Sequence, residues 1–252
     1  MTASDWILLA LGGFGAGAMN AIAGGGTFLS FPALLAIGLP PVTANASNSV
    51  ALWPASLASA WAYRRELARY RRHLPRLTLA AFLGGAVGGG LLLVTSNALF
   101  ARLVPWLLLT ATLLFALAPR INRWLEARRR AGPRQALGWG GTLFQLLVSV
   151  YGGFFGAGMG IVMIAAIAMQ GIEDINEINA LKNWLSAVIY SVAALTFTLG
   201  GAVSWPHTLV VLLAAAVGGY LAGYVARRLP AIWLRRFILL VGTALTLYYF
   251  LF

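Results

Sequence analysis

The chemistry that this chain suggests centres on Lys182, the single lysine of the sequence, in EINALKNWLS (177–186). All other basic side chains except the two histidines are arginines, and most of them occupy short polar breaks between apolar segments. Lys182 instead precedes a charge-free run, residues 183–226, with Asn179, Asn183 and Ser186 beside it at helical spacing. One interpretation is a lysine that snorkels from a helix end. We favour a buried or cavity-lining ammonium that attracts an anion.

Other titratable groups are sparse around it. Glu173, Asp174 and Glu177 are the candidates to pair with Lys182 when no anion is bound. No carboxylate lies inside a clear apolar crossing, so the Asp/Glu proton relay of many pumps is missing. His73 and His207 lie at membrane boundaries and the chain has no cysteine, which leaves no metal site, thiolate or Ser/His triad within the bilayer. We therefore expect no catalytic residue, no metal, no cofactor and no enzyme activity.

Two glycine-rich stretches would hold an anion near that lysine. NAIAGGGTFLSFP (20–32) puts three glycines before Thr27, a good N-cap for the next helix, and FFGAGMG (154–160) repeats the device. A helix N-terminus after glycines offers free N–H groups and the positive end of the helix dipole, which bind anions. The alternative is that these glycines only allow close helix packing. The candidate ligands are Asn20, Gly24, Gly25, Gly26, Thr27, Gly158 and Gly160.

Polar clusters also open two apolar helices, as TANASNS (43–49) and NEINALKN (176–183). Polar side chains are costly at lipid depth and tend to face a cavity. The alternative is a helix start wetted by lipid headgroups. The candidate substrate ligands here are Asn45, Ser47, Asn48, Asn179, Lys182 and Asn183. The asparagines would donate hydrogen bonds, and Lys182 would supply the formal charge.

The elements that position these residues are membrane helices. The 252-residue chain is 60% hydrophobic and 10% charged, against about 25% charged residues in soluble domains. Its charge-free windows are long enough for crossings of about 20 residues. The net charge of +12 comes from arginines in loops, where positive charge sets orientation, so nucleic acid is not an expected partner. The N-terminus is expected to be the first membrane segment and not a cleaved signal.

An internal repeat divides the chain into a first membrane repeat (1–125), an Arg-rich cytoplasmic linker (126–134) and a second membrane repeat (135–252). The repeat aligns PVTANASNS (41–49) with INEINALKN (175–183). The predicted fold class is an all-α polytopic membrane protein with broken or half helices and about eight membrane helices. Whether the short segments 27–37 and 159–172 cross fully or re-enter is left open, and we favour half-helices that meet at mid-membrane.

Arginine placement predicts that the two repeats have inverted topology. The loop YRRELARYRRHLPR (63–76) of the first half is Arg-rich, whereas its counterpart GGAVSWPH (200–207) has no arginine. The bias is reversed between the last two crossings of each half. Because positive charge marks cytoplasmic loops, segments 64–76, 119–134 and 226–236 should be cytoplasmic and both termini outside, in a bacterial inner membrane. Transporters built this way hold substrate near the midplane.

With this repeat, the chain resembles the TauE/SafE sulfite exporter family, also called the toluene sulfonate uptake permease family. The resemblance covers nearly the whole chain. It is carried by GAMNAIAGGGTFLSFPALLAIGLPPVTANASNS, GGFFGAGMGIVMIAAIAMQGI, EINALKN and AVGGYLAGYVARRLP. It implies two repeats, about eight membrane helices, and export or uptake of sulfite, organosulfonates such as sulfoacetate, and related anions. The clusters TANASNS and GAGMGIV depart from the family's usual forms.

The expected function is secondary transport of small anions, with export of sulfite or an organosulfonate by alternating access. A passive anion channel is the alternative, and a non-transporting assembly protein is a third reading. The expected partners are a small anionic substrate of the sulfite or sulfonate type and the lipid bilayer, with a homodimer left open.

Overall fold

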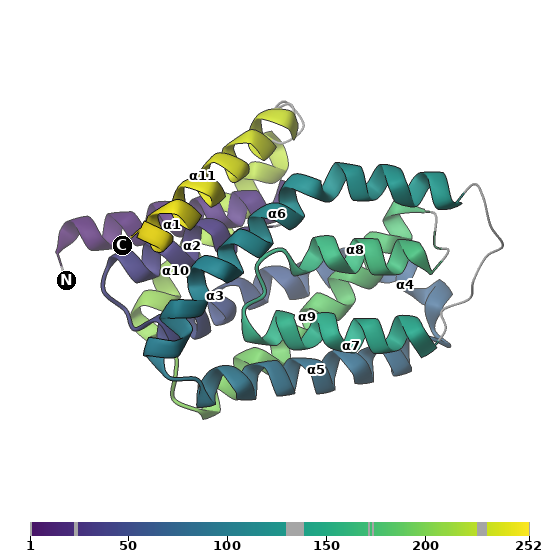
Figure 1. The fold of residues 1–252 in the computed structure, drawn as a ribbon, viewed down its shortest axis with the longest axis horizontal. Coiled ribbons are helices and arrows are strands. Elements are labelled where there is room, and N and C mark those ends of the chain that lie inside the picture. Colours follow the sequence, from purple (N-terminus) through teal and green to yellow (C-terminus); the bar gives the residue numbers. More distant parts are fainter. Residues whose placement is uncertain are drawn as a thin grey trace.

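The computed structural model describes residues 2–22, 25–129, 139–170, 172, 174–225 and 231–251. Within those ranges the chain is helical and contains no strand, which confirms the expected all-α class. Figure 1 shows the arrangement of the elements. They are α1 (Ala3–Ile22), α2 (Thr27–Ala36), α3 (Pro41–Ala62), α4 (Arg64–Leu67), the 3-10 turn η1 (Ala68–Tyr70), α5 (Leu74–Val94), α6 (Asn97–Arg129), α7 (Trp139–Phe154), α8 (Met159–Met169), α9 (Ile175–Leu199), α10 (Trp205–Val225) and α11 (Ala231–Leu251).

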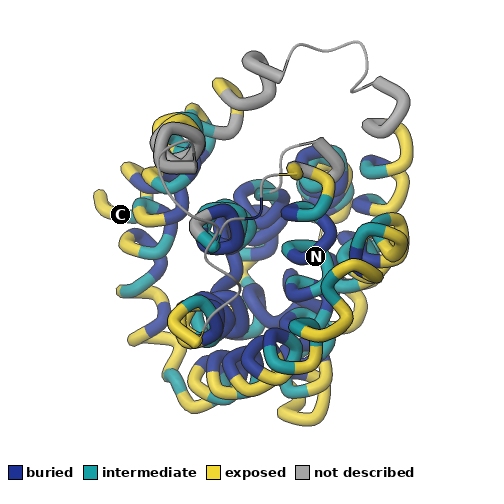
Figure 2. The backbone as a smooth tube through the Cα atoms, turned by 90° about the vertical axis from the view of Figure 1, so that its right-hand side faces the viewer, coloured by how far each residue is buried: buried dark blue, intermediate teal, exposed yellow. Residues whose placement is uncertain are grey.

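Three helices of the described ranges are long and apolar enough to cross a membrane, namely Leu74–Val94, Asn97–Arg120 and Asn176–Leu199. Figure 2 shows that exposed residues gather on the outer faces of the helices and buried ones on the inner faces. The outer face of α5 carries Leu79 and Leu83, both about half exposed. Such a surface suits lipid and not water. The number of crossings and the inversion of the repeats remain predictions.

The two short helices, α2 and α8, are arms of helical hairpins. They have 10 and 11 residues, or about 15 and 17 Å, against about 30 Å of hydrocarbon. α8 runs back along α7, so that Gly141 lies beside Gln170 at one end and Gly152 lies beside Met159 at the other. α2 runs back along α1 in the same sense. At these lengths neither helix spans the hydrocarbon layer along its own axis, and each pairs with the helix that precedes it.

Glycines bring helices from different halves of the sequence into backbone contact. α1 packs along α10, where a Cβ on Gly17 would overlap the main chain of Ala215. α5 packs along α7, where a Cβ on Gly88 would overlap the carbonyl group of Val150. Small residues permit such close approach of membrane helices. The result is a first bundle of α1, α2, α3 and α10 and a second bundle of α5, α7, α8 and α9, with α3 and α9 crossing between them (Figure 1).

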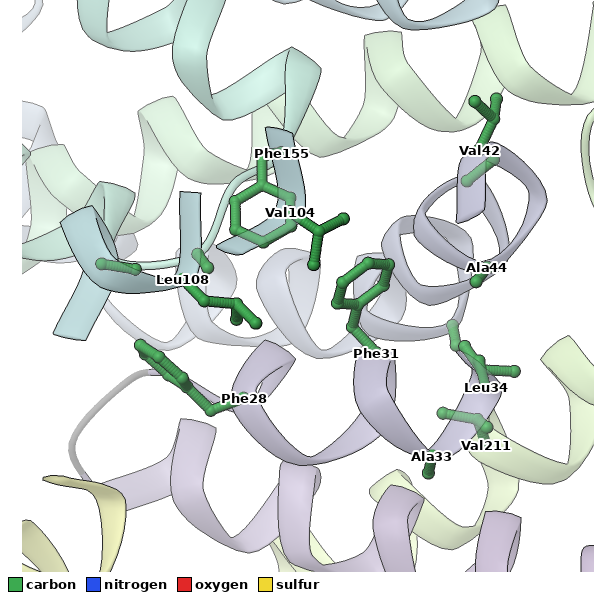
Figure 3. Packing of buried hydrophobic residues seen from close by; sticks show 14 of the residues in the cluster. Phe28, Phe31, Ala33, Leu34, Val42, Ala44, Val104, Leu108, Phe155 and Val211 are labelled. Atoms are coloured by element: carbon green, nitrogen blue, oxygen red, sulfur yellow. The ribbon is translucent and has the colours of Figure 1, made fainter. Parts of the chain in front are cut away.

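Phenylalanine side chains fill the junction of the bundles beside the N-terminal half of α3. The rings of Phe31 on α2, Phe100 on α6 and Phe155 after α7 lie edge to face, with centroids 5.5 to 6.4 Å apart. Aromatic pairs favour this geometry. Figure 3 shows Phe31 and Phe155 together with aliphatic side chains of the same cluster. We call Phe31, Phe100, Phe154 and Phe155 the phenylalanine plug.

Replacement of Gly88 tests the backbone contact between α5 and α7, and Gly90 on the same helix is the matched control. A Cβ at Gly88 would meet main-chain atoms of α7, whereas one at Gly90 has nothing within 4 Å. We expect Gly88→Ala to lower the apparent Tm in detergent by several degrees, because overpacking costs roughly 1–3 kcal/mol. Gly90→Ala should keep or raise the Tm, since alanine favours helix. Tryptophan fluorescence on heating measures both, and equal Tm values would contradict the contact.

Candidate functional site

A cavity of about 480 Å³ lies where the tips of the two hairpins meet α3, α9 and α10. Its inner end is formed by Gly25 and Thr27 at the α1–α2 tip and by Gly156 and Gly158 at the α7–α8 tip. From there it follows the C-terminal half of α3 as far as Ser59, which is exposed. The cavity therefore opens at the end of α3 that leads into the Arg-rich segment.

Seven of the thirteen expected ligands line this one cavity. They are Asn20, Gly25, Thr27, Gly158, Gly160, Lys182 and Asn183. They come from α1, both hairpin tips, α8 and α9, so the fold gathers residues that are more than 150 positions apart in the chain. Five others, Gly26, Asn45, Ser47, Asn48 and Asn179, are not among the lining residues. Gly24 lies outside the described residues.

Lys182 has no hydrogen-bond or ion-pair partner within the part of the chain that the structure describes. Its aliphatic stem passes the first turn of α8, because a Cβ placed on Gly160 would lie 3.6 Å from Lys182 Cδ. Among the described residues that line the cavity, Lys182 alone carries a charge. An unpaired ammonium that opens on a cavity without acidic groups attracts an anion.

The neighbouring acids have other partners. Glu177 accepts hydrogen bonds of 2.5 Å from both Arg69 and Tyr70, and Asp174 caps α9 by accepting from the Asn176 N–H at 2.7 Å. The expectation that an acid would pair with Lys182 is therefore wrong for these two, and Glu173 lies outside the described residues. The hydrogen bond to Glu177 and its charge raise the pKa of Arg69, so this pair is ionised and fixes the start of α9.

The α1–α2 tip is held by side chains and not by a threonine cap. Gly25 has a φ of 101°, a left-handed conformation that glycine adopts at little cost. The Gly26 N–H donates to Asn20 Oδ1 at 3.0 Å. Gly26 is the N-cap of α2 and no side chain caps the helix, so the expected capping by Thr27 is wrong. The Thr27 hydroxyl instead accepts from Asn48 Nδ2 at 3.4 Å.

The α7–α8 tip is also built on a left-handed glycine and a side-chain hydrogen bond, but with different residues. Gly158, with a φ of 74°, is the N-cap of α8 and lines the cavity. Tyr151 donates to the carbonyl of Ala157 at 2.6 Å and fixes the tip from the side of α7. No side chain caps α8. The first turn of α8 therefore presents its N–H end toward the space that Lys182 enters.

The polar cluster at the start of α3 joins elements and does not line the cavity. Asn45 donates to the carbonyl of Phe154 at 2.8 Å, and the Ser47 hydroxyl accepts from the Ser204 N–H at 2.9 Å. Asn48 accepts from the Ser30 hydroxyl. All three are buried. These side chains are expensive to bury unpaired, so they act here as ties between helices.

Sequence reasoning missed Tyr190. This residue lines the cavity and its hydroxyl lies 3.3 Å from the position of a Cβ built on Gly156. Lys182, Ser186 and Tyr190 follow one another at four-residue spacing on α9, and all three line the cavity. Residues at this spacing share one helix face. Following the helix face of Lys182 for two more turns along the sequence would have identified Tyr190.

Comparison with known proteins gives the family. The profile described as "Sulfite exporter TauE/SafE" matches residues 9–249. A Haemophilus influenzae protein named "Probable membrane transporter protein" is 30% identical over 214 residues, which cover 83% of this chain and 80% of the relative. The "Probable membrane transporter protein YfcA" of Escherichia coli K12 is 31% identical over 206 residues, covering 81% and 74%. The "Probable membrane transporter protein ORF9" of a Sinorhizobium species is 28% identical over 241 residues, covering 93% and 88%.

No solved structure gives a significant match. The family profile nevertheless spans almost the entire chain, and the relatives cover most of it. The chain therefore belongs to the TauE/SafE family and is a membrane transporter.

Proposed function

We propose that this protein is a secondary transporter of small anions that exports sulfite or an organosulfonate such as sulfoacetate. The observation that carries the proposal is the unpaired Lys182 in a cavity whose described lining holds no other charge. The cavity also contains the N-terminal ends of α2 and α8, which favour negative charge. Three electropositive features thus converge on one space.

An anion in this space would meet Lys182 and the first turn of α8 together. Lys182 supplies a charge-assisted hydrogen bond, which is shorter and stronger than a neutral one. Asn183 and Asn20 line the same cavity and offer amide groups. Tetrahedral sulfonate and pyramidal sulfite oxygens accept several such hydrogen bonds at once, so the proposed site suits oxyanions of this shape.

The walls support an organic anion. Leu52, Ile161, Ile164 and Leu212 line the cavity beside the polar groups. Its volume of about 480 Å³ falls in the range of about 300–1,000 Å³ that is typical of small-molecule sites. A sulfonate with a short carbon chain would place its charged head at Lys182 and its apolar part against these side chains.

The pattern of helix contacts supports the inverted repeat. If α1, α2, α3, α5 and α6 correspond in order to α7, α8, α9, α10 and α11, most contacts have a counterpart. The α1–α10 contact corresponds to α5–α7, the α5–α9 contact to α3–α10, and the α6–α8 contact to α2–α11. A pseudo-two-fold relation between residues 1–125 and 135–252 explains this pairing.

The same contacts favour moving units that differ from the two sequence halves. Motion of one half against the other would separate α1 from α10 and α5 from α7, whose backbones touch at glycines. Alternating access is easier if the first bundle rocks against the second about α3 and α9. The cavity lies between these bundles, as transport by this mechanism requires.

A carrier fits the structure better than the alternative, a passive channel. One end of the cavity is open beside Ser59, whereas the phenylalanine plug and the buried start of α3 fill the junction at the other end. A conducting channel needs a continuous path, and a carrier needs access from one side at a time. If Arg-rich segment 64–76 is cytoplasmic, the open side faces the cytoplasm.

The direction of transport follows from charge. An interior-negative membrane potential drives each net negative charge outward by about 2.3 kcal/mol per 100 mV. An anion that enters from the cytoplasmic side and leaves with net negative charge is therefore exported without another energy source.

Removal of the ammonium is the direct test of the proposal. We expect Lys182→Ala to lower sulfite or sulfoacetate flux in proteoliposomes by about 10- to 100-fold, because a hydrogen bond to a charged group contributes about 1.5–3 kcal/mol. Arg102→Ala removes an exposed cation of α6 that does not line the cavity and is the control. Flux that saturates with concentration would distinguish a carrier from a channel. Unchanged flux in Lys182→Ala with normal membrane insertion would refute the proposed site.

Chemical labelling tests access to the cavity. Because Lys182 is the only lysine, a small amine-reactive reagent should modify one side chain, and mass spectrometry separates it from the N-terminus. We expect sulfoacetate to slow this labelling. We also expect Ser59→Trp, at the cavity mouth, to slow it, whereas Leu57→Trp, exposed on the same helix but outside the lining, should not. Equal labelling rates in the two variants would place the entrance elsewhere.

A further inference from the structure

We infer that Lys182 also carries the coupling proton of the transport cycle, so that one proton crosses with each anion. In this scheme Lys182 binds the anion as an ammonium. After release, the empty transporter passes through the closed state, in which the cavity opens to neither side, with Lys182 as a neutral amine. The inference rests on the proposed function and adds the coupling ion to it. It follows from the described surroundings of Lys182, in which its charge has no partner, so that a bound anion would be its counter-charge.

Among the residues that the structure describes, the surroundings of Lys182 offer no permanent counter-charge. The helices that pack on α9 are α3, α4, α5, α7 and α8. α3 and α8 have no titratable side chain, and α7 contributes Tyr151, which donates to the Ala157 carbonyl. From α4, η1 and α5 come Arg64, Arg65, Glu66, Arg69, Tyr70 and Arg76, and from α9 itself Glu177 and Tyr190.

None of these groups neutralises Lys182. Glu177 is held by Arg69 and Tyr70, and Glu66 and Arg76 are not among the residues that line the cavity. The titratable side chains that share the described lining with Lys182 are Tyr190 and Tyr220, and phenols are neutral near pH 7 because their ordinary pKa is about 10. The bound anion is therefore the counter-charge of the ammonium.

In this arrangement the loaded step and the empty return step of a transport cycle differ in the charge that is buried on closure. With an anion bound, the closed state contains a neutral ion pair. Without an anion, closure around an ammonium would transfer an unpaired charge out of water, which costs several kcal/mol even after relaxation. A buried group in this position loses its charge instead. Lysine can do so, whereas arginine stays protonated.

The proton balance is simple. On the loading side, the ammonium R–NH3⁺ binds the anion. On the release side the anion leaves, and R–NH3⁺ gives its proton to water to form R–NH2 and H3O⁺. The neutral amine returns through the closed state and takes a proton from water on the loading side. The net result is movement of one anion and one proton in the same direction, with no change in Lys182.

Coupling of this kind sets the charge that crosses the membrane. A monovalent anion such as methanesulfonate would cross with no net charge. A divalent anion such as sulfoacetate would cross with one net negative charge, so that the membrane potential still favours its export. The absence of a carboxylate relay is then no obstacle to proton coupling, because the substrate-binding cation performs that role.

Proteoliposomes of the intact protein, with a pH dye inside and the potential clamped by valinomycin and potassium, test the inference. We expect sulfoacetate uptake to acidify the lumen by about one proton per anion, and methanesulfonate uptake to be independent of the clamped potential. Flux without a change in luminal pH would overturn proton coupling and leave the proposed transporter function intact. No flux of either sulfonate would instead overturn the proposed function, and the inference with it.

Lys182→Arg is the second test. This variant keeps the charge but does not release the proton. We expect it to lose at least tenfold in net uptake and to lose clearly less in the exchange of internal for external sulfoacetate, because exchange never requires an empty return. Arg102→Lys, outside the cavity, should keep both modes. Net uptake by Lys182→Arg at the wild-type rate would overturn the inference.

Discussion

The structure depends on one constraint: backbone N–H and C=O groups need hydrogen-bond partners where two helices end inside an apolar protein. No water in a hydrocarbon region satisfies such groups, so they need protein partners or a ligand. At the α1–α2 tip, Asn20 accepts from the Gly26 N–H. At the α7–α8 tip, Tyr151 donates to the Ala157 carbonyl. These side chains fix both breaks at the inner end of one cavity, and Thr27 of α2 and Met159 and Gly160 of α8 line that space. α9, which carries Lys182, packs on α3 and α5 and on both arms of the α7–α8 hairpin.

The two halves of the sequence differ in how the corresponding polar side chains are paired. Under the repeat alignment, Asn48 corresponds to Lys182, and Thr27 and Ser30 correspond to Ile161 and Ile164. Asn48 is satisfied by the hydroxyls of Thr27 and Ser30 and is buried. Beside Lys182, the hydroxyl residues are replaced by Ile161 and Ile164. Lys182 has no partner in the described chain, and it lines the cavity. One half therefore closes its polar cluster internally, and the other leaves a charge available to a solute.

Much of this was predictable from the sequence. Periodicity, glycine runs and arginine placement predicted the short segments 27–37 and 159–172 close to the observed α2 and α8, and Lys182, Thr27 and Gly158 proved to share one cavity.

The rest needed three-dimensional contacts. Sequence spacing does not say whether Asn45 faces a cavity or the Phe154 carbonyl, because either satisfies a buried amide. It also does not say that α1 packs on α10, since glycine permits close approach to any helix. Tyr190 was missed because a tyrosine in an apolar run is commonly part of the core.

The polar ties explain why the cavity is open at one end only. Val42 donates to Asn97 at 3.0 Å, Asn45 donates to Phe154 at 2.8 Å, and Ser47 accepts from Ser204 at 2.9 Å, all at the N-terminal half of α3. Of these bonds, Asn45–Phe154 joins the first bundle to the second, whereas Ser47–Ser204 lies within the first bundle. Under the proposed rocking of the bundles, opening of that end requires the Asn45–Phe154 bond to break and the phenylalanine plug to separate. A bond of this kind contributes only about 0.5–1.5 kcal/mol net, so Asn45–Phe154 adds a small stabilisation to the closed end. A contribution of this size favours closure of that end and still permits the opening that the proposed mechanism requires. Nearer the middle of α3, Trp53 donates to the Ser191 hydroxyl of α9 across the bundles at 2.8 Å. If the bundles rock about α3 and α9 as proposed, this bond lies close to the contact between those two helices, so it can persist while the Asn45–Phe154 bond breaks.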